Sequence, residues 1–444
     1  MLARNVALCN PSLSQRALKA AVQLTSVRII FLRICEDRGI EEYGVLQGLQ
    51  NGVHVYSRLS ELFQRADERY NSGLFHFSQE RDRSGQPDEL TLSLVIDDKP
   101  LKDILKALYY PDSPFEFSVL PIDILGQVYE QFLGKVIRLT AGHRAIVEEK
   151  PEVKKAGGVY YTPSYIVDYI VKNTVGRFID GKSTKQIANL RILDPACGSG
   201  SFLIGAYEYL LEWHRDWYIS DGAEKWVAKK DPRLFQGRNG WQLTTAEKKR
   251  ILLNNIHGVD IDPQAVEVTK LSLLLKVLEE ENAETIVKNL SLFHERALPD
   301  LSNNIKCGNS LIGDEFYDGQ QMGLLGQDDL YRVNPFNWKK QYPEIMKDDG
   351  FDVIIGNPPY VRIQALKEWV PAEVEFYKQE YRSAQKGNYD LYLLFVEQGL
   401  NLLSKSGKLG FILPSKFLTT DYGAGLRAHW AEKGVFDRVV DFGP

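Results

Sequence analysis

Four consecutive residues, Asn357, Pro358, Pro359 and Tyr360, place a side-chain amide, two prolines and an aromatic ring directly after the apolar run FDVIIG. Proline fixes its own φ and holds the residue before it in extended backbone, so this loop is stiff. We expect the amide oxygen of Asn357 and the carbonyl oxygen of Pro358 to form a rigid pair of acceptors. Such a pair suits an exocyclic amino group with two hydrogens to donate, and Tyr360 offers a flat face to the ring that carries it. The alternative is a plain turn after a strand.

The motif DPACGSGSF, residues 194–202, predicts a loop that approaches a ligand closely. It follows the short apolar run RIL and opens a helical pattern that runs through Leu210. Gly198 and Gly200 allow a tight backbone turn, and Asp194 can accept hydrogen bonds from an amine or an amide. A glycine pair that serves only a structural turn explains the loop about equally well.

Two further polar residues end apolar runs later in the chain. Asp260, in GVDIDP, is well placed to accept hydrogen bonds from both ribose hydroxyls of a nucleoside. Asn309, in CGNSL, could present its side chain to the edge of an adenine ring. Together with the glycine loop, these residues predict a cofactor that contains a nucleoside.

A long segment separates Gly200 from Asp260, whereas roughly 20 residues separate the equivalent features of a simple dinucleotide-binding fold. The extra residues, about 213–250, interleave aromatic and basic side chains that could hold the bases and phosphates of a nucleic acid. A small satellite core with a solvated face explains the same composition equally well. The side chains concerned are Trp213, Trp217, Trp226, Trp241, Lys225, Lys229, Lys230, Arg233, Arg238, Lys248, Lys249 and Arg250.

The elements that position these residues follow from the pattern after about residue 156, where short β-branched runs alternate with helical patterns. Such alternation predicts an α/β fold, with a parallel sheet covered by helices on both faces. Ligands of such sheets bind outside the carboxyl ends of the strands, near the point where strand order reverses. The predicted strands are RILD, IHGVDID, NIKCGNSL, FDVIIG, GKLGFILP and RVVDFG.

Helical patterns dominate the earlier part of the chain. Apolar residues recur at helical spacing over 14–38 and over 122–137. The charged stretch 147–158 predicts a linker, and 444 residues exceed what one hydrophobic core usually serves. We therefore expect a helical domain over 1–150 and an α/β domain over 151–444.

The composition excludes several classes of protein. No run of 18 apolar residues predicts a membrane span. The four cysteines, Cys9, Cys35, Cys197 and Cys307, lack the spacing of a zinc site or a disulfide framework, so we expect a reducing cytoplasm and no bound metal. With a net charge of -5, any nucleic-acid partner must be held by local patches or by a part of the protein outside these residues.

Taken together, the motifs resemble the gamma class of amino-group DNA methyltransferases, which modify adenine with S-adenosylmethionine. The resemblance covers about 157–444 and is carried, in order, by GGVYYTPSYIVDYIV, DPACGSGSF, GVDIDP, CGNSL, NPPY and GKLGFILPSKFL. It implies a Rossmann-like methyltransferase sheet, S-adenosylmethionine as cofactor and double-stranded DNA with an extruded adenine as substrate.

The resemblance also implies a place for each motif residue. Against the methionine end of the cofactor it places Tyr161, Thr162, Pro163, Asp194, Ala196 and Gly198. In the rest of the cofactor site it places Gly200, Phe202, Asp260 at the ribose, Ile261, and Asn309 at the adenine, where many relatives have aspartate. In the catalytic loop it places Asn357 and Pro358 at the amine, Pro359, and Tyr360 on the target base.

The helical part resembles the connector that precedes the methylase in type IIG restriction-modification enzymes, through FLRICEDRGI and DILGQVYEQFLGKVI. Those enzymes also carry a nuclease and a target recognition domain, which we expect in the full protein or in separate subunits. Asp88, Asp97 and Lys99 in PDELTLSLVIDDK are the nearest match to a nuclease site. One short strand cannot hold both halves of such a site.

We therefore expect a site-specific DNA adenine methyltransferase of a restriction-modification system, and two other functions stay open. Enzymes that methylate glutamine side chains of translation factors share the NPPY motif, but have little use for a large helical domain. A methylase-like scaffold could also serve as a catalytically silent DNA-binding subunit, although every position expected for the chemistry is filled.

Overall fold

The computed structural model describes residues 1–70, 73–79, 87–117, 135–149, 162–237, 240–279, 281, 298–317, 333–385, 389–420 and 423–441. The chain divides into two compact units, each assembled from segments that are separate in the sequence. The N-terminal unit comprises Met1–Tyr161, Gly222–Leu253 and Glu267–Asn303. The sheet unit comprises Thr162–Asp221, Asn254–Val266 and Asn304–Pro444. The N-terminal unit thus takes in two segments beyond the boundary that the sequence predicts near residue 150.

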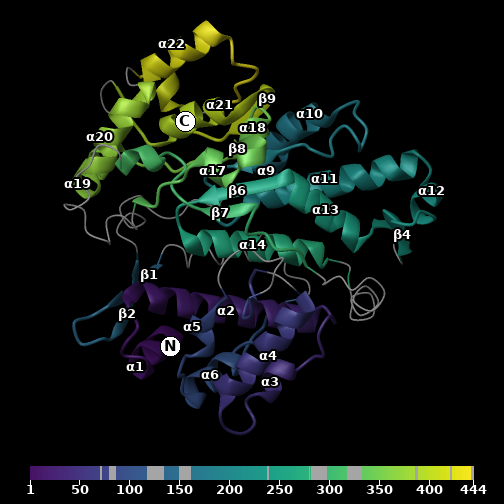
Figure 1. The fold of residues 1–444 in the computed structure, drawn as a ribbon, viewed down its shortest axis with the longest axis vertical. Coiled ribbons are helices and arrows are strands. Elements are labelled where there is room, and N and C mark those ends of the chain that lie inside the picture. The colour runs from purple at the N-terminus through teal and green to yellow at the C-terminus, as the bar shows by residue number, and fades with distance from the viewer. Residues whose placement is uncertain are drawn as a thin grey trace. The chain divides into compact units, whose positions relative to one another are not determined.

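Helices dominate the first part of the N-terminal unit. They are α1 (Leu2–Cys9), α2 (Gln15–Asp37), α3 (Val45–Gly48), α4 (Val55–Tyr70), α5 (Glu89–Leu92) and α6 (Asp98–Lys106). α2 begins where the Oγ of Ser14 accepts a hydrogen bond from the backbone N–H of Ala17, and Gly39 follows its end with a φ of +66°. These bounds confirm the helix predicted over 14–38. In Figure 1, α1 and α5 lie against α2.

A β-hairpin occupies the region where the sequence predicts the end of a helix and the start of a linker. β1 (Lys135–Leu139) pairs antiparallel with β2 (Ala145–Glu149). The predicted helix is therefore wrong at 135–137, its residues 122–134 lie outside the described ranges, and the predicted linker is wrong at 147–149. Both strands carry adjacent β-branched residues, which favour extended backbone over helix.

Asp88 and Asp97, the two carboxylates in the segment that best matches a nuclease site, form contacts within the N-terminal unit. The structure has the starts of α5 and α6 where the sequence predicts a strand. Asp88 caps α5 by accepting a hydrogen bond from the backbone N–H of Thr91, and it pairs with the buried guanidinium of Arg28 at 2.8 Å. Asp97 accepts a hydrogen bond from the side-chain amide of Asn5 at 2.6 Å. Both carboxylates hold the N-terminal unit together.

The sheet unit is built on a five-stranded parallel sheet, which confirms the predicted α/β fold. Its strands are β3 (Ile192–Asp194), β6 (Ile256–Asp260), β7 (Ile305–Cys307), β8 (Phe351–Gly356) and β9 (Leu403–Phe411). Their order in the sheet is β7-β6-β3-β8-β9, so the chain reverses direction across the sheet between β3 and β8. Leu193, Val259 and Ile354 from the three middle strands form a buried core with Trp338 and Phe351.

Helices precede, connect and follow these strands. They are α9 (Ser164–Val171), η1 (Lys172–Gly176), α10 (Arg177–Ile179), α11 (Ser201–Ser220), η2 (Asp314–Tyr317), α17 (Trp338–Gln341), α18 (Pro343–Lys347), α19 (Ile363–Trp369), α20 (Pro371–Glu380), η3 (Arg382–Ala384), α21 (Tyr392–Leu402), η4 (Ser415–Leu418) and α22 (Ala424–Lys433). α11 contacts α9, β3 and β6. Within the described ranges, no helix combines the length and the apolar character that crossing a membrane requires.

The segment after α11 differs from the predicted insertion. α11 continues ten residues past Leu210 to Ser220, so Trp213 and Trp217 belong to this helix. The segment then forms α12 (Ala223–Val227), a hairpin of β4 (Leu234–Gly237) and β5 (Gly240–Leu243), and α13 (Thr245–Asn255); α14 (Pro263–Val277) follows β6.

The last predicted strand, RVVDFG, is absent from its described residues 438–441. Val439 and Val440 are exposed there, and the guanidinium of Arg438 donates hydrogen bonds to Tyr169 and Asn173. β-branched residues form a strand only where a neighbour pairs with them and buries one face. Among the described strands, none pairs with this segment.

Candidate active site

The sheet brings three of the predicted polar residues to one edge. β3 ends at Asp194, β6 ends at Asp260, and β8 ends at Gly356, directly before Asn357. β6 and β8 are the two neighbours of β3, and all three strands are parallel. Their carboxyl ends therefore meet where strand order reverses, which is the usual ligand position of such a sheet.

The glycine loop is tied to the end of β6 by its backbone. Gly198 and Gly200 adopt φ values of +53° and +89°, which residues with a side chain rarely adopt. The backbone N–H of Gly198 donates to one carboxylate oxygen of Asp260 at 2.9 Å, and the N–H of Asp262 donates to the other at 2.8 Å. The carboxylate of Asp260 therefore holds both the glycine loop and the turn that follows β6.

Asp194 is a buried carboxyl group at the centre of this edge. Its Oδ1 accepts a hydrogen bond from the backbone N–H of Ala196 at 3.0 Å, and no described cation pairs with it. Burial raises the pKa of Asp194 to about 8, and the negative charge of Asp260 adds to this effect. A buried carboxyl group with a raised pKa is suited to bind a positively charged ligand, because that charge stabilises the ionised carboxylate.

Gly356 allows β8 to approach Asp194 closely. A Cβ atom at this position would lie 2.7 Å from Oδ1 of Asp194, which is closer than real contacts allow. Any side chain would push the loop that follows, including Asn357, away from the glycine loop. The requirement depends on packing across the sheet, so the sequence alone gives no sign of it.

The loop after β8 holds the side chain of Asn357 from two sides. Its Nδ2 donates a hydrogen bond to the Oγ1 of Thr162 at 3.0 Å, and its Oδ1 accepts one from the hydroxyl of Tyr360. The same hydroxyl lies 3.0 Å from the carbonyl oxygen of Ile412, which follows β9. Of the two prolines, Pro358 is buried and Pro359 is exposed.

Tyr360 is anchored at its ring as well as at its hydroxyl. The ring is partly buried against a large apolar cluster and meets Tyr392 edge to face, with 5.8 Å between ring centroids. Burial raises the pKa of Tyr360 to about 12, so the phenol stays protonated and can donate its hydrogen bond at neutral pH.

The remaining predicted residues lie at or near the same edge. Ile261 is 48% exposed directly after Asp260, which is unusual for a large apolar side chain and suits a flat ring. Phe202 is buried in α11, Ala196 is partly buried beside Asp194, and Pro163 precedes α9. Tyr161 lies outside the described residues.

Asn309 forms hydrogen bonds within the protein that the sequence does not predict. Its side chain is buried, its Oδ1 accepts a hydrogen bond from the backbone N–H of Leu311, and its own N–H donates to the carbonyl oxygen of Asn334. The hydroxyl of the next residue, Ser310, donates a hydrogen bond to the carbonyl oxygen of Pro195 at 2.6 Å. Ser310, which sequence analysis missed, therefore joins the loops after β3 and β7.

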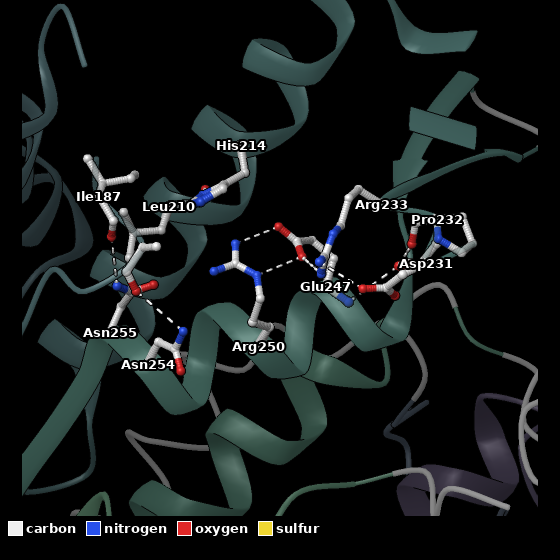
Figure 2. A network of polar contacts seen from close by, with 12 residues as sticks. Ile187, Leu210, His214, Asp231, Pro232, Arg233, Glu247, Arg250, Asn254 and Asn255 are labelled. Atoms are coloured by element: carbon white, nitrogen blue, oxygen red, sulfur yellow. Dashed lines mark hydrogen bonds and ion pairs between the residues drawn. The ribbon is translucent and has the colours of Figure 1, made fainter. Parts of the chain in front are cut away.

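Three of the eight basic residues that the sequence analysis singled out between 213 and 250 form ion pairs or hydrogen bonds within the protein. The carboxylate of Glu247 is fully buried and forms ion pairs with Arg233 and Arg250, both at 2.6 Å, as Figure 2 shows. The ammonium group of Lys248 donates to the carbonyl oxygen of Glu279 at 2.7 Å. A buried carboxylate needs such partners, so these cations favour the satellite-core interpretation. Arg238 lies outside the described residues.

Comparison with known proteins adds two matched families. The family model for N-6 DNA Methylase matches residues 121–305, and the model for Eco57I restriction-modification methylase matches residues 254–444. The type II restriction enzyme and methyltransferase RM.Eco57I of Escherichia coli is 34% identical over all of this chain and 40% of its own length. The type II methyltransferase M.BstVI of Geobacillus stearothermophilus is 34% identical over 64% of this chain and 38% of its own.

A solved structure shows the same fold. The type IIL restriction-modification enzyme MmeI, in complex with DNA, superposes with a TM-score of 0.51 at 16% identity, over 97% of this chain and 52% of its own. This chain thus spans about two fifths of the length of the curated relatives named above.

Proposed function

We propose that this chain, which belongs to the N6-adenine DNA methylases of restriction-modification systems, transfers a methyl group from S-adenosylmethionine to the exocyclic amino group of adenine in DNA. The observation that carries the proposal is the meeting of Asp194, Asp260 and Asn357 at one edge of a parallel sheet. The first two suit a charged nucleoside cofactor, and the third suits an amine.

The cofactor site follows from the chemistry of the side chains present. When bound, S-adenosylmethionine supplies a methyl group on a sulfonium, which is a strong electrophile. Asp260 would accept hydrogen bonds from the ribose hydroxyls, and Asp194 would pair with the ammonium of the methionine end. Ile261 and Asn309 would meet the face and the edge of the adenine ring. These assignments use the position of Asp260 at the end of β6 and the burial of Asp194, which has no described cation as partner.

Cofactor affinity is expected to rise with pH up to about 8. At lower pH the carboxyl of Asp194 is largely protonated in the free protein, because its pKa is raised to about 8. A bound ammonium favours the ionised form, so binding releases this proton. We expect affinity for S-adenosylmethionine to increase by up to about tenfold per pH unit from about pH 6 and to level off above the pKa.

Isothermal titration calorimetry in buffers of different ionisation enthalpy measures both the affinity and the proton released. Asp194→Asn, which cannot titrate, should bind more weakly and with a flat pH profile. A wild-type affinity that stays constant between pH 6 and pH 8 would show that Asp194 does not face the ammonium.

The target amine would be held by the catalytic loop. An adenine must leave the duplex before its amino group can be reached. The Oδ1 of Asn357 and the carbonyl oxygen of Pro358 would then accept hydrogen bonds from its two N–H groups. This orientation would direct the nitrogen lone pair toward the methyl group. No covalent enzyme intermediate is required, since alignment of nitrogen, methyl and sulfur supplies most of the rate. As the nitrogen–carbon bond forms, the carbon–sulfur bond of the cofactor would break and leave a neutral thioether, and the nitrogen would then release one hydrogen as a proton to solvent.

Tyr360→Ala is expected to lower the single-turnover rate on DNA by about fivefold to about 150-fold, the equivalent of losing roughly 1 to 3 kcal/mol of base stacking. Tyr360→Phe should retain most of the rate, because the ring stays packed on Tyr392 and Thr162 still holds Asn357. Rapid-quench transfer of labelled methyl groups measures both. A phenylalanine variant as slow as the alanine variant would show that the hydroxyl, and not the ring, matters.

Further domains belong to the proposal as partners. The relative RM.Eco57I is named as both a restriction enzyme and a methyltransferase, and this chain matches 40% of it. We infer that a nuclease and a target recognition domain work with this methylase, in the rest of the protein or in separate subunits. Sequence specificity would then reside largely in the recognition domain.

A methyl transfer assay with two substrates tests the function. The chain is incubated with radiolabelled S-adenosylmethionine and either unmethylated DNA or a glutamine-containing translation-factor peptide. Label in DNA alone is the expected result. Label in the peptide would establish a protein-glutamine methyltransferase, and binding of cofactor and DNA without turnover would establish a silent subunit.

A further inference from the structure

We propose that Thr162 is a positioning residue that orients the side-chain amide of Asn357 for reaction with the target amine. This inference deepens the proposed function and rests on it. Thr162 is the first described residue of the sheet unit and precedes α9, whereas Asn357 follows β8, 195 residues later. Their contact is therefore built by the fold and not by the catalytic motif itself.

The contact is a partly buried hydrogen bond: Thr162 is buried and Asn357 is half-buried. The side-chain Nδ2 of Asn357 donates to the Oγ1 of Thr162 at 3.0 Å, and Thr162 is only 6% exposed. Water cannot easily take the place of the hydroxyl in such a position. Removing it would leave the Nδ2 group without its hydrogen-bond partner, which is unfavourable away from water.

An asparagine amide needs such a partner, because the torsion about its Cβ–Cγ bond has a broad energy profile. Without contacts at its end, the amide plane would sample many orientations, and Oδ1 would meet the target amine in only some of them. Misplacing an acceptor by about 1 Å can cost about two orders of magnitude in rate. Thr162 restricts this rotation from the Nδ2 side.

Tyr360 restricts the same amide from the Oδ1 side, but less securely. Its hydroxyl has a single proton and two acceptors within reach, the Oδ1 of Asn357 and the carbonyl oxygen of Ile412. When the proton goes to Ile412, Thr162 is the one described partner that still holds the amide. A donated N–H bond also makes the amide oxygen a better acceptor. Thr162 thus acts on the reaction through Asn357.

The resemblance to DNA methyltransferases implies a different role, in which Thr162 contacts the methionine end of the cofactor. The two roles predict different losses. A positioning role lowers the rate of methyl transfer at saturating cofactor and leaves cofactor affinity unchanged. A cofactor contact made by the hydroxyl lowers cofactor affinity first.

The test compares Thr162→Val, which keeps the side-chain shape without the hydroxyl, with Thr162→Ser, which keeps the hydroxyl. Thr174→Val is the matched control, because Thr174 is equally buried at 6% and its hydroxyl donates only to backbone carbonyls within its own helix. Each full 444-residue variant is assayed for single-turnover methyl transfer to in-vitro amplified DNA and for affinity toward S-adenosylmethionine by calorimetry.

We expect Thr162→Val to slow transfer by tenfold or more, Thr162→Ser to stay within about threefold of wild type and Thr174→Val to match wild type. Cofactor affinity should stay within about threefold in all three. Adding Tyr360→Phe should cost far more in the Thr162→Val background than in the wild type, since the amide then loses both partners. If Thr162→Val does not fold, judged by thermal unfolding, Thr162→Ala replaces it.

A Thr162→Val variant that transfers methyl groups at the wild-type rate would overturn the inference and leave the proposed function intact. An affinity loss that accounts for the whole rate loss would also overturn it, in favour of a cofactor contact. A wild-type protein that binds the cofactor and transfers no methyl group to DNA would instead contradict the proposed function itself.

Discussion

Asn357→Ala should reduce methyl transfer to DNA by a factor on the order of 100 to 1000 or more, while the affinity for S-adenosylmethionine stays near the wild-type value. The side chain follows β8 and bonds only to Thr162 and Tyr360 among the described residues. Its removal takes away the acceptor that would hold one hydrogen of the target amine. It leaves Asp194 and Asp260 in place.

Single-turnover transfer and calorimetry on the same preparation separate the two effects. Asn173→Ala is a suitable control, because Asn173 lies on η1 of the same unit and its side chain bonds to the carbonyl oxygen of Tyr169 and to the guanidinium of Arg438. It should behave as wild type in both measurements. Comparable losses of rate and of cofactor affinity in Asn357→Ala would remove Asn357 from the role at the amine.

Asp260→Ala should weaken cofactor binding by about tenfold to about 150-fold, the equivalent of about 1.5 to 3 kcal/mol for a charged acceptor. Two causes act together. The ribose hydroxyls lose their acceptor, and the glycine loop loses the bond that ties the N–H of Gly198 to β6. Asp260→Asn should lie between wild type and alanine, since an amide can accept only through its oxygen.

Calorimetric titration with S-adenosylmethionine measures this loss. The neighbouring Asp262→Ala serves as a control for local charge, because the side chain of Asp262 accepts a hydrogen bond from the N–H of Gln264 at the start of α14. It should cost much less affinity. An Asp260→Ala protein with unchanged affinity would move the cofactor to another part of the molecule.

The parallel sheet could be predicted from sequence because its signals are local. Five of the six apolar runs became its strands, and the polar residues at the ends of four of them predicted the ligand edge. Asp194, Asp260 and Asn357 were placed together by one general rule, that carboxyl ends of parallel strands meet. The sixth run failed because a strand needs a neighbour, and a sequence does not show whether one is present.

Features that depend on tertiary packing could not be predicted. The need for Gly356 arises from the side chain of Asp194 on the adjacent strand. The bond between Thr162 and Asn357 joins residues that no motif connects. The ion pair between Arg233 and Glu247 could not be predicted either, because a sequence rich in cations does not show that a buried carboxylate lies beside them.

The most direct test of the account is to identify the methylated atom. DNA amplified in vitro, which carries no methyl groups and offers many sequences, is incubated with the chain and S-adenosylmethionine that carries a trideuterated methyl group. Digestion to nucleosides and mass spectrometry should show N6-trideuteromethyl deoxyadenosine, and the product should be missing with Asn357→Ala. Label on cytosine, or DNA without label from a protein that binds the cofactor, would contradict the assignment of this chain as an adenine methyltransferase.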